Sequence, residues 1–113
     1  MPTHTMLVFS NPAVGREDEF NRWYDQQHIP DILNVPGFVA AQRFRLSNPQ
    51  PRPEQQKYAY AVVYDIETDD LDGTLSALAS AAKGMTMTDA MQRPALQSVF
   101  SAVGPRVEIP RRK

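Results

Sequence analysis

The chain of 113 residues contains no cysteine, and this absence excludes several kinds of chemistry. Disulfides, thiol nucleophiles and zinc–cysteine sites all require a thiol, so none of them can form here. Only two histidines are present, whereas a catalytic zinc ion normally needs three well-placed ligands. Because disulfides are absent, the chain fits a reducing compartment, and we expect a cytoplasmic protein.

An excess of positive charge is also missing, since 12 lysines and arginines stand against 13 aspartates and glutamates. Nucleic-acid binding needs clustered positive charge, so we expect no nucleic-acid partner. Residues 1–10 lack the basic start and the long apolar run of a signal peptide or a membrane span. Glycine-rich phosphate loops are absent too, and we expect no cofactor. A metal site formed by His28, Asp31 and Asp25 is a weak alternative, and we expect no bound metal.

Apolar segments alternate with turn-forming residues and divide the chain into four strands and two helices. Strands are predicted over 4–10, 38–46, 58–66 and 95–103, and helices over 16–27 and 70–83. Pro30 disfavours helical geometry at Ile29, so we expect the first helix to break near His28. The order β-α-β-β-α-β predicts an α+β fold, a ferredoxin-like protomer with an antiparallel four-stranded sheet and both helices on one face. We expect one domain over residues 1–113.

Two of the predicted strands do not alternate between apolar and polar residues, as a strand with one wet face should. The runs 6–9 and 58–64 are apolar or aromatic throughout, which indicates that both faces of the sheet are buried. Two helices can cover only one of these faces. We therefore expect a second copy of the chain to cover the other face, which makes the protein a homodimer.

The stretch from Phe20 to Asp31 carries polar and aromatic residues where an ordinary amphipathic helix would place leucine, isoleucine or valine. Phe20, Tyr24 and His28 are four residues apart and share one stripe of a helix. Trp23 lies beside this stripe, and Asp31 follows three residues after His28. Tyrosine and tryptophan bury apolar area but also need a hydrogen-bond partner, as residues that line a pocket do. The stretch therefore predicts a pocket for a small hydrophobic molecule.

The same region resembles a known family. Its matching segments are the run Trp23-Tyr24-Asp25, the run His28-Ile29-Pro30-Asp31, the run Val35-Pro36-Gly37-Phe38 and the pair Arg43-Phe44. They are similar to the EthD-like branch of the dimeric α+β barrel superfamily. The resemblance implies a ferredoxin-like protomer whose sheet packs face to face with that of a second copy, and a cleft between sheet and helices. Superfamily relatives include cofactor-free monooxygenases, polyketide cyclases, dehydratases or decarboxylases, and lactone isomerases, so the resemblance leaves the reaction open.

Three residues of the stretch are candidate catalytic groups. His28 could act as general base or acid on a carbon next to a carbonyl or on a phenol, or it could satisfy helix-end carbonyls in a structural role. Tyr24 could donate a hydrogen bond to a developing oxyanion, or it could be an aromatic core residue. Asp31 could orient His28, although a role as the first-turn acid of a short helix is the simpler interpretation.

Four further residues are candidates for substrate binding. Phe20 and Trp23 flank the catalytic groups, although a tryptophan at this spacing is more often part of the core. Tyr60 shares a strand face with two other tyrosines, and the three could line a pocket or pack between two sheets. Arg43 could pair with a substrate carboxylate, although arginines near strand ends are usually solvated or ion-paired.

These residues favour a cofactor-independent enzyme that acts on a small, largely apolar carbonyl or phenolic compound, with His28 as general acid or base. The reaction class could be that of a cyclase, dehydratase, isomerase or oxygenase. The alternative is a non-catalytic dimeric protein that binds the same kind of compound. In a third, structural interpretation the aromatic residues fill the core and no cavity exists.

Overall fold

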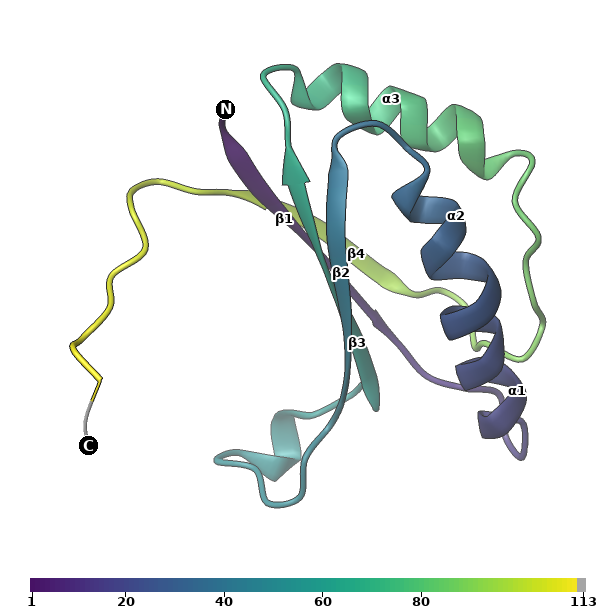
Figure 1. Cartoon of the computed structure of the whole chain (residues 1–113). Coiled ribbons are helices and arrows are strands. Elements are labelled where there is room, and N and C mark those ends of the chain that lie inside the picture. The colour runs from purple at the N-terminus through teal and green to yellow at the C-terminus, as the bar shows by residue number, and fades with distance from the viewer. Residues whose placement is uncertain (112–113) are drawn as a thin grey trace.

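A four-stranded sheet carries all the main helices on one of its faces in the computed structural model, which describes residues 1–111 (Figure 1). The strands are β1 (Thr3–Ser10), β2 (Phe38–Arg45), β3 (Tyr60–Glu67) and β4 (Leu96–Ser101). They lie in the order β2-β3-β1-β4, and every neighbouring pair is antiparallel. Helices α1 (Glu17–Trp23), α2 (Ile29–Leu33) and α3 (Leu71–Ala82) pack on the same face. This is the predicted α+β, ferredoxin-like fold.

The core lies between the sheet and the helices. Side chains alternate along β1 and β3, so that the even-numbered residues in the middle of each strand point to the helices and are buried. The odd-numbered residues between them point to the other face and are only partly covered within one chain, as Leu7, Phe9 and Val63 are. The buried apolar residues of these strands and of the first helical run are Met6, Val8, Phe20, Trp23, Tyr24, Ile32, Tyr60, Val62, Tyr64 and Ile66.

The first helical run differs from the prediction at Pro30. We expect a break near His28, but the chain stays helical from the start of α1 to the end of α2, so this prediction is wrong. A π-helical turn, η1 (Tyr24–His28), widens the run so that the backbone N–H of Ile29 donates to the carbonyl of Tyr24, five residues earlier. Proline has no N–H to donate, and its ring clashes with the carbonyl four residues back in a regular α-helix. The wider turn removes this conflict, which allows Pro30 to sit in the first turn of α2.

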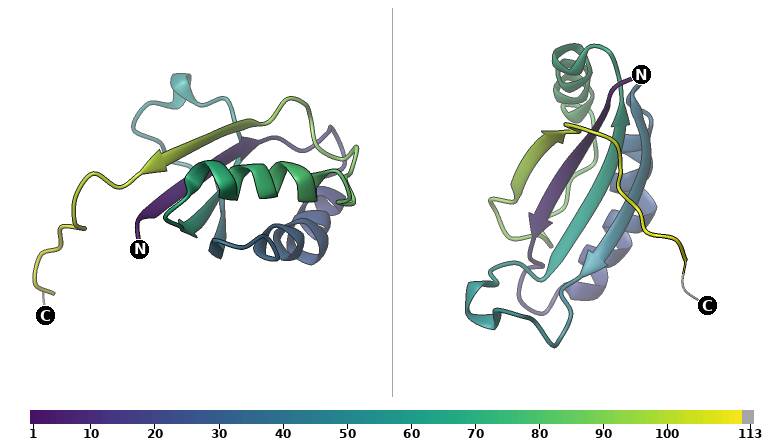
Figure 2. Two further views of the ribbon diagram at one scale, coloured as in Figure 1. Left: turned by 90° about the horizontal axis from the view of Figure 1, so that it is seen from above. Right: turned by 90° about the vertical axis from the view of Figure 1, so that its left-hand side faces the viewer.

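Helix α3 and the connection 83–95 after it cover the half of the sheet that α1 and α2 leave free (Figure 2, left). Asp70 caps α3, since its Oδ1 accepts a hydrogen bond from the backbone N–H of Gly73 at 2.9 Å. The connection then returns beside the first helical run before it enters β4 (Figure 1). The helices and this connection therefore form a single layer over one face of the sheet.

The other face of the sheet is open in the single chain (Figure 2, right). Phe44, Leu96 and Phe100 project from this face and expose 46%, 47% and 59% of their surface. Loop 46–59, which holds the short 3-10 helix η2 (Pro53–Gln55), and the C-terminal segment 102–111 lie on this side of the sheet (Figure 1). Within residues 1–111, no helix combines the length and the apolar character needed to cross a membrane.

Candidate functional site

An inner cavity of about 440 Å³ lies between the sheet and the helices, a volume in the range of small-molecule sites. Its polar lining residues are Tyr24, His28, Tyr64, Gln97 and Ser98. The rest of its wall is apolar and comes from Met6, Val8, Ile32, Leu75, Leu78, Ala79, Ala82, Met85, Met87, Met91, Ala95 and Val99. No lysine, arginine, aspartate or glutamate is among the described residues that line it. The structure therefore contradicts the interpretation in which aromatic residues fill the core and leave no cavity.

His28 lines this cavity at the end of the π-helical turn. Its Nδ1 is buried and has no hydrogen-bond partner within residues 1–111. Burial lowers the pKa of His28 below its ordinary value, and the negative charge of Asp31 opposes this shift. The imidazole is therefore neutral near pH 7, and its unprotonated nitrogen can accept a proton.

The π-helical turn also sets the orientation of the His28 ring. Trp23 and His28 are five residues apart, and their rings stack with centroids 4.3 Å apart and planes 17° from parallel. Residues five apart point to different sides of a regular α-helix, whereas the wider π-helical turn brings them close to alignment. The indole N–H of Trp23 also donates to the backbone carbonyl of Thr86 at 2.9 Å, which ties the connection 83–95 to the helix. Trp23 thus supports His28 from outside the cavity.

Tyr24 and Tyr64 bring two further polar side chains to the cavity. Tyr24 contacts His28 edge to face with centroids 5.5 Å apart, and its hydroxyl lies 3.9 Å from the sulfur of Met91. Burial raises the pKa of Tyr24 and of Tyr64, so both hydroxyls are protonated at neutral pH. The sequence names Tyr64 only as one of three tyrosines that could line a pocket and does not select it over Tyr60, because only the packing of the helices shows which of the two reaches the cavity.

Asp31 lies in the first turn of α2 and is half-buried. One oxygen of its carboxylate accepts a hydrogen bond from the side-chain amide of Gln27 at 2.8 Å. The negative charge of Asp31 opposes the lowering of the His28 pKa. No hydrogen bond within residues 1–111 joins the two side chains. The orienting role of Asp31 therefore stays a prediction. In the same part of the chain, no cluster of three or more histidine or acidic side chains is placed to hold a metal ion.

Three of the residues predicted to bind substrate gather in a separate cluster beneath α1. The guanidinium carbon of Arg43 lies 5.6 Å from the ring centroid of Phe20 and 5.3 Å from that of Tyr60. It also lies 4.9 Å from the ring centroid of Tyr24, which lines the inner cavity. A cation over aromatic faces is an attractive arrangement. The cluster therefore joins β2 and β3 to α1.

Most polar groups of this cluster have protein partners, although Nε of Arg43 is buried without a hydrogen-bond partner within residues 1–111. Arg43 donates to the side chain of Asn21 at 2.8 Å and to Asp25 at 3.1 Å. The hydroxyl of Tyr60 donates to the carboxylate of Glu17. Arg43 is thus ion-paired, as the simpler interpretation has it, and neither Arg43 nor the core residue next to it, Phe20, lines the inner cavity.

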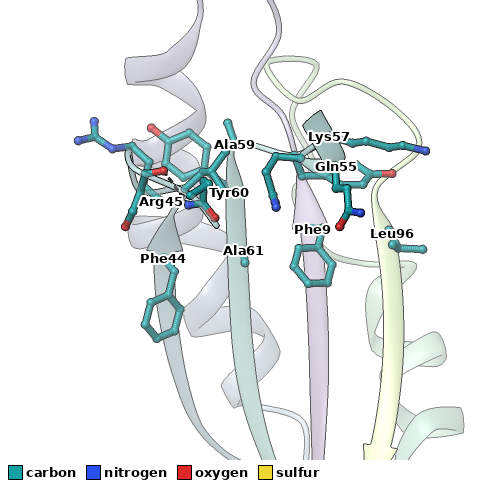
Figure 3. Close-up of a pocket in the computed structure, with 14 residues that line it drawn as sticks. Phe9, Phe44, Arg45, Gln55, Lys57, Ala59, Tyr60, Ala61 and Leu96 are labelled. Atoms are coloured by element: carbon teal, nitrogen blue, oxygen red, sulfur yellow. Dashed lines mark hydrogen bonds between the residues drawn. The ribbon is translucent and has the colours of Figure 1, made fainter. Parts of the chain in front are cut away.

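A second hollow of about 470 Å³, the outer groove, lies on the open face of the sheet beneath loop 46–59 (Figure 3). Phe9, Phe44 and Leu96 point into it from three different strands or their ends (Figure 3). Arg45 and Lys57 are also among its lining residues, but no histidine or carboxylate of the described chain is. The outer groove therefore has no group suited to proton transfer near pH 7, and the inner cavity is the candidate site.

Comparison with protein families gives a match over much of the chain. The sequence profile of a family described as a domain of unknown function, DUF4286, matches residues 9–82. This range runs from the end of β1 through α3 and includes Tyr24, His28 and Tyr64. No curated protein sequence matches the chain at a significant level.

Solved structures with the same fold cover nearly the whole chain. A candidate monooxygenase from Shewanella loihica PV-4 has a TM-score of 0.62 at 10% identity and covers 93% of this chain and 99% of that chain. The heme-degrader MhuD from Mycobacterium tuberculosis has a TM-score of 0.57 at 21% identity, with coverage of 92% and 99%. An ethyl tert-butyl ether d (EthD) family protein from Bacillus halodurans C-125 has a TM-score of 0.57 at 13% identity, with coverage of 95% and 100%. At these identities the likeness shows the fold alone: it is the predicted ferredoxin-like α+β fold, and the EthD family protein shares it.

Proposed function

We propose that this chain, which belongs to the DUF4286 family, is a cofactor-independent enzyme that binds a small, neutral, largely apolar carbonyl or phenolic compound in the inner cavity. In this proposal His28 is the general acid or base. The observation that carries it is a histidine kept neutral by burial that lines an uncharged, mostly apolar cavity. A structural histidine would be bonded to helix-end carbonyls, whereas Nδ1 of His28 has no partner in residues 1–111.

The chemistry that fits these groups is proton transfer at the carbon next to a carbonyl group. Neutral His28 takes the proton from that carbon, and the electron pair of the broken C–H bond moves toward the carbonyl oxygen to form an enolate. Tyr24 donates a hydrogen bond as negative charge grows on that oxygen. The imidazolium of His28 then returns the proton to the carbon, or to another atom of the product. The apolar wall holds the hydrocarbon part of the ligand and excludes water.

The similarity to MhuD points to a different kind of ligand, because MhuD is described with two hemes bound in its active site. Heme carries two carboxylates, and the burial of a carboxylate is costly unless a cation or hydrogen-bond donors pair with it. The described lining of the inner cavity contains no lysine or arginine, and the nearby Arg43 is already paired with Asp25. These observations favour a neutral ligand, and our proposal contains no heme.

The assembly that we infer is a homodimer formed through the open face of the sheet. Three large apolar side chains, Phe44, Leu96 and Phe100, are exposed on this face. Exposed apolar patches on a soluble protein commonly mark an interaction surface. A two-fold pairing of identical sheet faces would cover the patch in both copies and leave each inner cavity separate. Analytical ultracentrifugation of the whole chain measures this association directly.

Hydrogen–deuterium exchange into 2-tetralone tests the proposed proton transfer. This bicyclic ketone is small, neutral and largely apolar, and NMR follows the exchange of its α-hydrogens in D₂O. We expect the protein to accelerate this exchange over buffer, and His28→Gln to lose about 100-fold or more of the acceleration, as removal of a general base does. His4→Gln makes the same change at the other histidine, outside the lining of the inner cavity, and should keep the full rate.

Each outcome of this assay has a definite meaning. Binding of 2-tetralone without acceleration would favour the non-catalytic binding protein. Neither binding nor acceleration would contradict the proposal for this class of ligand. Full acceleration by His28→Gln would show that another group is the base.

A further inference from the structure

The four tyrosines of the chain place their hydroxyl groups in different surroundings. The hydroxyl of Tyr60 is bonded to a glutamate of α1. Tyr58 lies on the open face, where its ring is 6.1 Å from that of Phe9. The hydroxyl of Tyr24 has a sulfur atom at 3.9 Å, and thioether sulfur is a weak acceptor.

Tyr64 differs from the other three. The residue is 1% exposed, comes from the middle of β3 and lines the inner cavity. The tyrosine hydrogen bonds found within residues 1–111 involve Tyr24 and Tyr60 but not the hydroxyl of Tyr64. The buried side-chain atoms without a partner within residues 1–111 belong to Ser10, His28 and Arg43 and not to Tyr64, so the Tyr64 hydroxyl keeps access to the cavity that the residue lines. The side from which a partner can reach Tyr64 is the cavity.

We propose that Tyr64 determines the specificity of the inner cavity by donating a hydrogen bond to the carbonyl oxygen of a neutral ketone. This inference rests on the proposed function, because it requires a ligand in that cavity. Tyr64 would act together with Tyr24. The two side chains are close enough that a negative charge on Tyr24 would raise the pKa of Tyr64. Because burial raises the pKa of both, the pair offers two O–H donors rather than a negative charge at neutral pH.

The surroundings of this pair select the type of oxygen atom. A carboxylate would need a cation, and the described lining of the cavity has none. A phenol would bring a further O–H donor to a place that already has two. A carbonyl oxygen has two lone pairs and no proton, so it can accept from both Tyr24 and Tyr64. The ligand class that fits is therefore a neutral ketone with a hydrocarbon body that packs against the apolar wall from α3.

Two probes with the same ring skeleton separate the hydrogen bond from the apolar contacts. These are 2-tetralone and tetralin, which lacks the carbonyl oxygen. NMR titration of the methionine methyl signals measures both dissociation constants, since four of the five methionines line the cavity. We expect Tyr64→Phe to weaken the binding of 2-tetralone about 3- to 10-fold and to leave tetralin unchanged, which is the effect of losing one hydrogen bond. Tyr60→Phe is the matched control on the same strand. The hydroxyl that it removes is hydrogen-bonded to Glu17, so neither dissociation constant should change.

A third probe, tetralin-2-carboxylate, tests the preference for a neutral ligand, and we expect it to bind at least about 10-fold more weakly than 2-tetralone. Equal affinity for this carboxylate would overturn that preference. If Tyr64→Phe weakens both neutral probes alike, or neither, the role of Tyr64 is wrong while the proposed function stands. If the wild-type protein binds neither neutral probe, the proposed function fails and this inference fails with it. Unchanged methionine signals of the free variant establish that Tyr64→Phe is folded.

Discussion

The two faces of the sheet carry hollows of nearly equal size but of opposite chemical character. The inner cavity has about 440 Å³ and the outer groove about 470 Å³. The inner one places a half-buried histidine and two protonated tyrosines in an uncharged wall. The outer one has two cations, long amide side chains and no acid or base that works near pH 7. Volume therefore does not identify the site, whereas convergent polar groups with shifted pKa values do.

The largest expected difference between the two faces is in stability, and two phenylalanines make a matched pair. Phe20 is 0% exposed against the inner face, whereas Phe44 is 46% exposed on the open face. We expect Phe20→Ala to lower the free energy of unfolding by about 3–5 kcal/mol, because it leaves a cavity in the core. Phe44→Ala should cost less than about 0.5 kcal/mol at a protein concentration low enough to keep the chain monomeric. Urea denaturation measures both values.

The same pair of variants tests the homodimer. If a second copy covers the open face, unfolding depends on protein concentration, and Phe44→Ala becomes more costly as the concentration rises. Phe20→Ala should show the same cost at every concentration. A cost of Phe44→Ala that does not change with concentration would contradict a dimer formed through this face.

A smaller effect is expected from two arginines of β2. Arg43 is paired with Asn21 and Asp25 and lies over three aromatic rings, whereas Arg45 is exposed. We expect Arg43→Met to lower the free energy of unfolding by about 1–3 kcal/mol, since it removes a partly desolvated cation–π contact and two hydrogen bonds to a charged group. Arg45→Met is the matched control and should stay within about 0.5 kcal/mol of wild type. Equal costs for the two variants would show that the cluster beneath α1 does not stabilise the inner face.

The fold is largely predictable from the sequence because it depends on local periodicity and turn residues. Helix α3 starts after its cap at Asp70, where the prediction places the start of a helix, and β3 lies within two residues of its expected bounds. The exception is the region before Pro30. The steric rule for the residue before proline describes a regular helix, and it does not anticipate a π-helical turn that accommodates the ring.

The candidate site is predictable only in part. The four-residue spacing places Phe20, Tyr24 and His28 in one row, and the structure keeps their rings in contact, with centroids 5.2 Å and 5.5 Å apart. The row nevertheless divides at Tyr24, since Phe20 faces the Arg43 cluster and His28 faces the cavity. That division depends on where α3 and the connection 83–95 pack, which no local pattern encodes. The choice of Tyr64 over Tyr60 as the tyrosine that lines the cavity has the same cause.

The smallest expected effect is the pH dependence of stability that His28 confers. Its pKa in the folded protein is lowered by burial, while in the unfolded chain it is near the ordinary value of about 6.5. As the pH falls through that value, the unfolded chain binds a proton that folded His28 resists, so stability decreases until the pH reaches the folded pKa. Asp31 limits this loss because its charge favours the protonated ring. Urea denaturation from pH 7.5 to 5.5 should therefore show a decline that is smaller in His28→Gln. A decline of equal size in wild type and in His28→Gln would contradict this assignment to the inner cavity.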